Sequence, residues 1–320
     1  MTSALEYTGN LKWLMDNVIY LTVHGSNAYG TNTPTSDLDI KGVCVPPNNY
    51  LMGFNHKFEQ ADKSFNYDTT IYGVQKFFEL AANCNPNIIE VLWVEDSDII
   101  TATNSGGKVL RKNKERFLSK KARHTFSGYA TAQLKRIKGH RSWLLNPPSQ
   151  PPSRAEYGLP PLRKADKDQV KAAEFLLDQG YGYGSNFQEM IEKEKAFGIL
   201  ETQWEQYQNW KANRNPDRAA LEAKFGFDLK HAGHLYRLMV MCGEIATEGK
   251  VIVKRPDRDI IMAIKNGEWS YEKLVGWAED MDNKMDELYE NSSLPNSPDR
   301  EYLDELCCQI VSDSYEYDFM

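Results

Sequence analysis

The chain has 320 residues, enough for about two domains of ordinary size, and its 41% hydrophobic and 26% charged content is typical of a folded globular protein. No apolar run approaches the ~20 residues needed to cross a bilayer, and the N-terminus lacks a signal-peptide pattern, which predicts a cytoplasmic protein without a membrane partner. Five scattered cysteines without a CxxC pair argue against a disulfide framework, and the net charge of −7, taken whole, argues weakly against a nucleic-acid partner.

The N-terminal part alternates short helices and strands. Residues 18–23 are β-branched and aromatic, which predicts a buried strand. Gly25 and Ser26 break this strand, and a short helical turn to Gly30 follows. In chain order we expect a helix over 4–17, strands over 18–23, 38–45 and 64–71, a helix over 74–82, and a strand or late-helix segment over 88–94.

The remaining chain has a helical pattern. Residues 146–161 hold six prolines, which predicts a loop or hinge. Helices are expected over 108–145, 168–179, 187–213, 216–225, 228–248, 257–265, 270–290 and 298–312. This order predicts an α+β fold with two domains. Residues 1–145 would form a small mixed β-sheet core with flanking helices, and residues 146–320 a mostly helical domain.

The segment from Val23 to Lys41 carries the most chemical information. A strand that ends at Gly25-Ser26 and turns into a helix presents backbone N–H groups suited to phosphate, and Gly25 removes the side chain that would keep the phosphate away. Asp37 and Asp39 lie two positions apart at the next strand, so they share a face at a spacing of about 6–7 Å. Two such carboxylates repel each other unless a hard cation such as Mg²⁺ or Mn²⁺ lies between them. The alternative is an Asx-rich turn that merely leads into a strand.

This segment resembles the signature of the polymerase-β-type nucleotidyltransferases: a Gly-Ser pair, a short helix, then Asp-x-Asp on the next strand. Its sequence, GSNAYGTNTPTSDLDIKGV, is most similar to that of the RNA-ligase-associated (RlaP-type) branch, which is common in bacteria and their viruses. Three further segments resemble that branch: Asn85-Pro-Asn-Ile-Ile-Glu90, Lys230-His-Ala-Gly-His-Leu-Tyr-Arg-Leu238, and the region around Gly267-Glu-Trp-Ser-Tyr271. The resemblance implies that residues 1–145 form a nucleotidyltransferase catalytic domain, and that residues 146–320 contribute to nucleotide and substrate binding.

The resemblance also calls for a third carboxylate on a neighbouring strand. Asp68 is the best match, with Asp62 in reserve and Glu59 after it. A lone Asp in a strand is otherwise an exposed edge residue. Lys41 shares the face of Asp37 and Asp39, so it would balance their charge or touch the substrate.

A later helix offers a cationic stripe. Lys230, His234 and Arg237 fall at i, i+4 and i+7, on one helix face. By resemblance this stripe would grip the triphosphate of the incoming nucleotide. The alternative is a solvated helix face. Glu90 is interpreted as structural.

A second cationic feature is a run of positive charge. Twelve Lys and Arg residues lie between Lys108 and Arg141 with Glu115 as the one acid, so this stretch carries +11 and the rest of the chain −18. Phe117, His124, Phe126, Tyr129 and Trp143 lie in or beside it, and cations with aromatics suit a single-stranded or structured RNA end. The alternative is a helix whose aromatics are core and whose lysines are solvated. The candidate nucleic-acid contacts are Lys120, Lys121, Arg123, Lys135, Arg136, Lys138 and Arg141.

Together these features predict a metal-dependent enzyme that transfers NMP from an NTP such as ATP to an acceptor hydroxyl. An RNA 3′ end, for example that of a tRNA under repair, is the expected acceptor, and a bacterial or phage-infected cell the expected setting. The alternatives are transfer to a protein side chain or a small molecule, as in toxin-like relatives, and a catalytically inactive nucleotide- or RNA-binding protein. The oligomeric state is left open.

Overall fold

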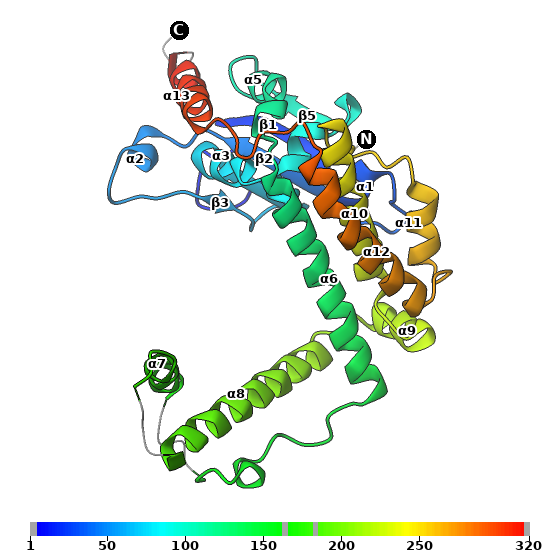
Figure 1. The fold of residues 1–320 in the computed structure, drawn as a ribbon. Coiled ribbons are helices and arrows are strands. Elements are labelled where there is room, and N and C mark those ends of the chain that lie inside the picture. The colour runs from blue at the N-terminus through cyan, green and yellow to red at the C-terminus, as the bar shows by residue number, and fades with distance from the viewer. Residues whose placement is uncertain (1–4, 162–165, 182–184, 317–320) are drawn as a thin grey trace. The chain divides into compact units, whose positions relative to one another are not determined.

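The computed structural model describes residues 5–161, 166–181 and 185–316 (Figure 1). The chain contacts divide it into two compact units. Unit 1 consists of 1–137 together with 229–320, and unit 2 consists of 138–228. The strands are β1 (Val18–His24), β2 (Asp39–Cys44), β3 (Gln60–Ala61), β4 (Asp68–Gly73) and β5 (Ile99–Ala102).

The helices and 3₁₀ turns fall between and after these strands. They are α1 (Gly25–Tyr29), α2 (Asn48–Leu51), α3 (Val74–Ala82), α4 (Pro86–Ile89), η1 (Glu90–Trp93), η2 (Asp96–Asp98), α5 (Gly107–Lys112), η3 (Lys114–Phe117), α6 (Lys121–Leu145), η4 (Arg154–Tyr157), α7 (Lys167–Asp178), α8 (Ser185–Ala212), α9 (Pro216–Phe225), α10 (Leu229–Glu248), α11 (Arg258–Lys265), α12 (Tyr271–Glu290) and α13 (Arg300–Glu316). In the described part of the chain, no helix combines the length and apolar character that crossing a bilayer requires.

Unit 1 is built on a five-stranded mixed sheet with the order β3-β4-β2-β1-β5. β2 pairs antiparallel with β1 and parallel with β4, while β5 and β3 pair antiparallel at the two edges. The parallel pair needs a crossover, which the segment containing α2 and β3 supplies. The predicted α+β fold with a small mixed sheet is confirmed.

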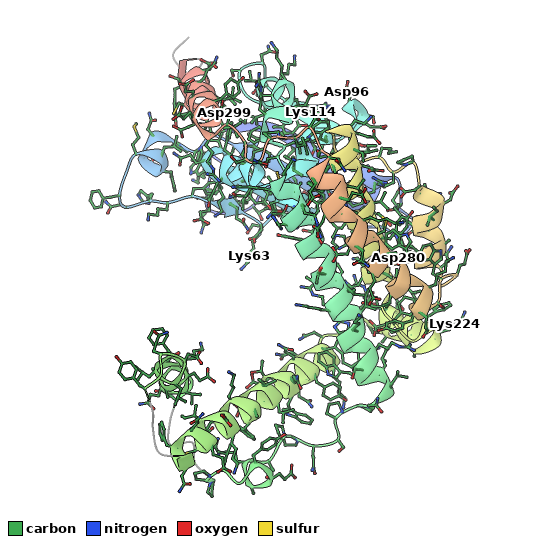
Figure 2. The ribbon with its side chains drawn as sticks, in the orientation of Figure 1. Lys63, Asp96, Lys114, Lys224, Asp280 and Asp299 are labelled. Atoms are coloured by element: carbon green, nitrogen blue, oxygen red, sulfur yellow. The ribbon has the colours of Figure 1, made fainter. Side chains whose placement is uncertain are left out.

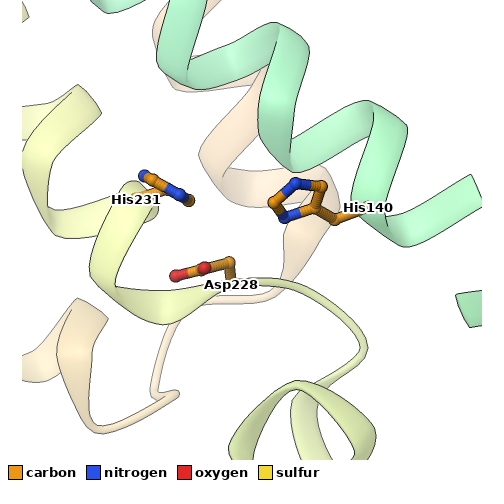
Figure 3. Close-up of side chains that lie close together, drawn as sticks. All are labelled: His140, Asp228 and His231. Atoms are coloured by element: carbon orange, nitrogen blue, oxygen red, sulfur yellow. The ribbon is translucent and has the colours of Figure 1, made fainter. Parts of the chain in front are cut away.

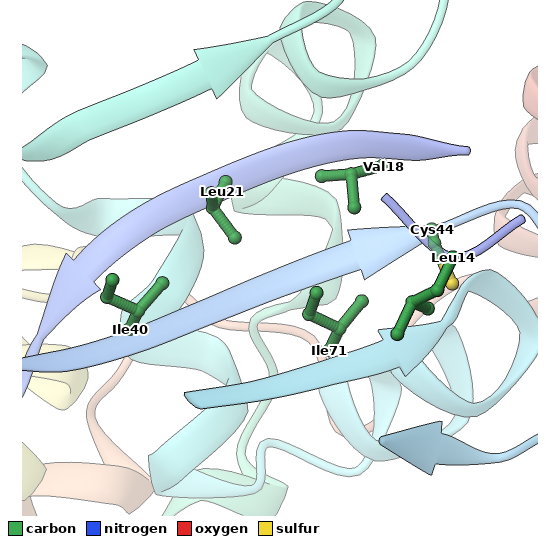
Figure 4. Packing of buried hydrophobic residues seen from close by; sticks show 6 residues of the cluster. All are labelled: Leu14, Val18, Leu21, Ile40, Cys44 and Ile71. Carbon is green, nitrogen blue, oxygen red and sulfur yellow. The ribbon is translucent and has the colours of Figure 1, made fainter. Parts of the chain in front are cut away.

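One face of this sheet packs into an apolar core. Figure 4 shows the cluster of buried side chains on this face, which consists of Leu14, Val18, Leu21, Ile40, Cys44 and Ile71. Because side chains alternate along a strand, Ile40 on this face leaves its neighbours Asp39 and Lys41 on the other face of β2. The hydrophobic pattern of β2 therefore fixes which face carries the polar groups.

Helices from the end of the chain complete unit 1. α10 packs against α11 and α12, and α13 packs against α3. Charged side chains such as Asp280 on α12 and Lys114 on η3 lie on its surface (Figure 2). Unit 2 contains η4, α7, α8 and α9, and α7 packs on α8. α7 begins with a capping box in which Asp166 and Gln169 bond each other's backbone N–H groups.

The two units differ from the predicted domains, which met at residue 145. The five-stranded sheet packs in one unit with α10 to α13, because the chain leaves unit 1 within α6 and returns to it at α10. The proline-rich stretch 146–161 lies inside unit 2, so it does not mark the division.

Several predicted elements differ in detail. The helix expected over 4–17 is instead an irregular segment in which Tyr7 pairs with Phe65 and Leu14 is buried against the sheet. The segment 88–94 is helical, since it belongs to α4 and η1. The edge strand β5 was not predicted. The Gly-rich stretch 180–185 is typical of a loop, and residues 182–184 of it lie outside the described residues.

Candidate active site

The turn after β1 is shaped by the absence of a side chain. β1 ends at His24, and α1 begins at Gly25, whose φ of +63° favours glycine. A Cβ at Gly25 would lie 1.8 Å from Oδ2 of Asp39, so glycine leaves room here for a carboxylate. We expected the absence of a side chain at Gly25 to leave room for a phosphate. In the structure the Asp39 carboxylate occupies the position where that side chain would lie. Phosphate binding by Gly25 and Ser26 stays a prediction.

Two predicted carboxylates lie side by side at the start of neighbouring strands. Asp39 is the first residue of β2 and Asp68 the first of β4, and the two residues pair in register across the parallel strands. Paired residues on adjacent strands are about 4.8 Å apart and point to the same face. Asp37 precedes the strand, where Asn27 Nδ2 donates to its backbone oxygen at 3.0 Å. Asp37 and Asp68 are exposed, while Asp39 is half-buried.

The environment of Asp39 disfavours its negative charge. Burial is the main cause that raises the pKa of Asp39, and the charges of Asp68 and Asp37 add to it. Lys230 and Lys41 act in the opposite direction without cancelling these effects. A cation bound among the carboxylates would relieve this repulsion. Their oxygen donors match the preference of Mg²⁺ or Mn²⁺, so the residues present fit a hard divalent ion.

The reserve carboxylates have other neighbours. Oδ2 of Asp62 accepts a hydrogen bond from Gln60 at 3.4 Å, and Glu59 lies 3.6 Å from Lys76 Nζ. Asp68 is the carboxylate that pairs in register with Asp39. We therefore retain Asp68 as the proposed third metal ligand.

Two predicted cations lie near the carboxylates. Lys41 Nζ donates to the backbone oxygen of Asn87 at 2.8 Å. Burial lowers the pKa of Lys41 to about 8, although Glu90, Asp39 and Asp68 favour its charged form. Lys230, at the start of α10, is exposed and close enough to lower the pKa of Asp39. Both lysines stay candidates for substrate contact.

The other two members of the predicted stripe have different environments from Lys230. Burial lowers the pKa of His234 to about 3, so its imidazole is neutral near pH 7. Arg237 is buried, and its Nη1 lies 2.5 Å from Oε1 of Glu90. Its guanidinium also lies 3.8 Å from the ring centroid of Tyr29. Of the three, only Lys230 presents an exposed charge. Triphosphate binding by His234 and Arg237 stays an untested prediction.

Sequence reasoning missed a buried network beside the carboxylates. Glu90 has no exposed surface, and its carboxylate accepts hydrogen bonds from Arg237 and from the Tyr29 hydroxyl, the latter at 2.5 Å. His24 Nε2 lies 3.7 Å from the same carboxylate. The signals were present in the sequence, since Glu90 and Arg237 each lie in a segment that resembles the RlaP-type branch. Nothing in either segment indicates that they meet.

A second feature missed at the sequence level is how the loop after α1 is held. Arg258 Nε donates to the backbone oxygen of Gly30, and Lys265 Nζ donates to that of Thr31 at 3.1 Å. The backbone N–H of Arg255 donates to the Tyr29 oxygen at 3.1 Å. Two cations of α11 and one backbone N–H of the loop before it therefore hold residues 29–31, at the end of α1.

Most of the predicted nucleic-acid contacts on or beside α6 have intramolecular partners. Arg123 lies 3.2 Å from Asp282 and 2.9 Å from Asp286, both on α12. Three other cations bond backbone or amide oxygens: Lys120 with Glu290, Lys121 with Asn83, and Arg141 with Gly226. Lys135, Arg136 and Lys138 are exposed. Of these, Lys135 and Arg136 are the best placed for an external polyanion.

The aromatic residues of the basic stretch also divide into two groups. Phe117 and Phe126 are fully buried in the core, so the expectation that they stack on bases is wrong. His124 is exposed and lines a groove of about 350 Å³ along α6. The other lining residues are Arg123, Ser127, Gly128, Thr131, Ala132 and Lys135.

Unit 2 brings together two further groups of the kind that bind metals. Ligand atoms of His140 on α6 and of Asp228 lie within 4.8 Å of each other (Figure 3). His140 also stacks on Trp143, with ring centroids 5.6 Å apart. His231, also labelled in Figure 3, belongs to unit 1, so no ion is assigned to this pair.

Comparison with known proteins found a family model and a relative that match the sequence. Residues 6–144 match the model of the RlaP family, which is described as the RNA repair pathway DNA polymerase beta family. The chain is also similar to an uncharacterised 38.9 kDa protein of Enterobacteria phage T4, encoded in the nrdC-mobD intergenic region. The two are 23% identical over 291 residues, which cover 82% of this chain and 86% of the phage protein. No solved structure matches the chain significantly.

Proposed function

We propose that this protein is a metal-dependent nucleotidyltransferase that transfers NMP from an NTP to an RNA 3′ end, because residues 6–144 match the model of the RNA repair pathway DNA polymerase beta family. The observation that carries the proposal is the pairing of Asp39 with Asp68 beside the Gly25-Ser26 turn. Two adjacent carboxylates that disfavour each other's charge have little structural use, but they suit a site for divalent ions and nucleotide phosphates.

The residues take the following roles. Asp37, Asp39 and Asp68 would hold the divalent ions, which when bound offset the negative charge of the phosphates. Gly25 and Ser26 would bind the outer phosphates of the NTP through backbone N–H groups and the serine hydroxyl. Lys230, which is exposed and electrostatically coupled to Asp39, would contact the same phosphates.

The reaction follows from these placements. The acceptor hydroxyl oxygen attacks the α-phosphorus in line while the bond to the bridging oxygen of the β-phosphate breaks, and pyrophosphate leaves. The hydroxyl proton passes to Asp68 or to water. Little covalent chemistry falls to the protein, so its contribution is to align the reactants and to stabilise charge.

RNA is the proposed acceptor. The family description concerns RNA repair, and Lys135, Arg136 and Lys138 are exposed on α6. A tRNA end and ATP are the first substrates to try. Transfer to a protein or a small molecule, and loss of catalysis with retained binding, are the outcomes that the experiments below must separate.

The first experiment tests whether nucleotide binding depends on the carboxylates. Calorimetry of Mg·ATP binding is compared between the wild type and Asp37→Ala/Asp39→Ala. We expect binding that requires Mg²⁺ in the wild type and is lost in the variant. Binding that is unaltered in the variant would contradict the proposed site.

The second experiment identifies the acceptor. The protein is incubated with each α-labelled NTP together with total RNA, and the label is traced to RNA, to protein or to neither. We expect label in RNA with the wild type and none with Asp39→Asn. Label in protein alone would replace RNA as the acceptor, and label in neither fraction would support the inactive alternative.

A further inference from the structure

Glu90 is a buried carboxylate that joins three separate elements of unit 1. It is the first residue of η1, and its two oxygens bond Arg237 of α10 and the hydroxyl of Tyr29, the last residue of α1. The two bonds are each 2.5 Å long. A fully buried ion pair of this kind is often replaceable by apolar residues without loss of stability, so stability alone gives a weak reason for its presence.

The network adjoins the proposed metal ligands. Tyr29 belongs to α1, the helix that begins at Gly25, and the charge of Asp39 acts on its hydroxyl. His24, beside Glu90, lies opposite Asp39 in the pairing of β1 with β2. A displacement of Glu90 would therefore shift Tyr29 and His24, and through them the Asp39 carboxylate.

Arg237 extends the network to the proposed phosphate contact. It lies seven residues after Lys230, about two turns along α10. Its guanidinium is held both by Glu90 and by the face of the Tyr29 ring, 3.8 Å from the centroid. The position of Lys230 relative to Asp39 thus depends on where Arg237 is anchored.

We propose that Glu90 and Arg237 are positioning residues of the active site. Their ion pair, completed by the Tyr29 hydroxyl, holds the Gly25 turn, the Asp39 carboxylate and the Lys230 end of α10 in register for the NTP. This inference rests on the proposed nucleotidyltransferase function. It assigns the pair no contact with substrate.

The test uses one mild variant, one severe variant and one matched control. Tyr29→Phe removes the hydroxyl, with its hydrogen bonds to Glu90 and to His24 Nε2, and keeps the ring that packs on Arg237. Glu90→Gln removes the buried charge. The control is Glu244→Gln, which weakens another buried ion pair of α10: Glu244 Oε2 lies 2.7 Å from Arg255 Nη1. Melting curves first define a temperature at which all variants are folded. Mg·ATP affinity and the rate of label transfer at saturating ATP are then measured.

We expect a pattern that a purely structural role would not give. Tyr29→Phe should slow transfer about 10-fold with little change in melting temperature, and Glu90→Gln about 100-fold, since small displacements of aligned groups cost rates of this size. Glu244→Gln should lower the melting temperature but leave the transfer rate within about twofold of the wild type. The inference is wrong if folded Tyr29→Phe and Glu90→Gln transfer at the wild-type rate, or if Glu244→Gln is slowed equally. If wild-type protein shows no Mg²⁺-dependent ATP binding that Asp39→Asn abolishes, the proposed function fails, and this inference fails with it.

Discussion

Gly25 and Asp39 occupy the same small space: a Cβ on Gly25 would lie 1.8 Å from the Asp39 carboxylate. The left-handed backbone of Gly25 and the inward position of Asp39 are therefore one structural feature. A substitution at either residue tests it.

Gly25→Ala should destabilise the fold and impair the site. An L-residue at φ +63° costs about 1–2 kcal/mol, and displacing Asp39 should add about 1 kcal/mol or more. Gly249→Ala is the matched control, because Gly249 has the same φ but nothing within 4 Å of an added Cβ. Urea unfolding gives the difference between the two variants, and calorimetry gives their Mg·ATP affinity. Equal losses of stability in the two variants would contradict the contact.

Asp39→Asn should make the metal-free protein more stable and inactive. The folded state raises the pKa of Asp39, so the ionised carboxylate is disfavoured on folding, and this cost is present above its folded pKa. Removing the charge should raise the melting temperature at pH 7.5 by a few degrees. The gain should disappear as the pH falls below the ordinary pKa of an aspartate, where both states are protonated. Asp280→Asn, at an exposed site on α12 (Figure 2), should show no such gain.

The stability of the protein should fall in mild acid because of two histidines. Burial lowers the pKa of both His24 and His234, the latter to about 3, so below pH ~6.5 the unfolded chain binds protons that the folded chain does not. The stabilisation is complete above pH ~6.5 and is lost as the pH falls, by up to about 1.4 kcal/mol per pH unit for each histidine. Glu90 lies 3.7 Å from His24 but is engaged by Arg237, so it does not reverse this direction.

Unfolding measured between pH 7.5 and pH 5 checks this slope. His234→Gln should flatten it, whereas His124→Gln, at an exposed position on α6, should leave it as in the wild type. An unchanged slope in His234→Gln would show that its imidazole accepts a proton in the folded state.

The exposed end of the basic stretch should bind RNA through phosphates. Lys135→Glu/Arg136→Glu should weaken RNA affinity and reduce the salt dependence of binding by about one to two units of log–log slope. Lys284→Glu, on the exposed side of α12, is the control for a charge reversal away from α6. Affinities measured from 50 to 200 mM salt give both quantities. If the double variant and the control bind alike, α6 is not the RNA surface.

Local chemistry in the sequence was enough to predict the metal-ligand candidates. The strand that begins near Asp39 follows from β-branched and apolar alternation, and the Gly25-Ser26 break follows from turn chemistry. Asp68 was chosen by resemblance, and its register with Asp39 is a property of the parallel pairing of β2 with β4. The sequence of neither strand alone indicates that β2 pairs with β4.

The long-range parts of the site were beyond the sequence. Glu90 and Arg237 are separated by 147 positions, and each looks ordinary in its own segment. Helical spacing placed Arg237 in a cationic stripe and the resemblance gave that stripe a phosphate-binding role, but neither indicates that Arg237 pairs with Glu90. The ion pairs of Arg123 could not be predicted either, because its partners Asp282 and Asp286 lie on α12, far away in the sequence.

The discontinuity of unit 1 has a consequence during synthesis. The sheet and Glu90 leave the ribosome well before α10 does, and at about 5–20 residues per second Arg237 follows Glu90 after roughly 7–30 s. Until then the nascent sheet carries a carboxylate without its guanidinium partner. Unit 1 cannot be completed until α10 has been synthesised, and ribosome-bound chains that stop before α10 should be open to proteases and chaperones.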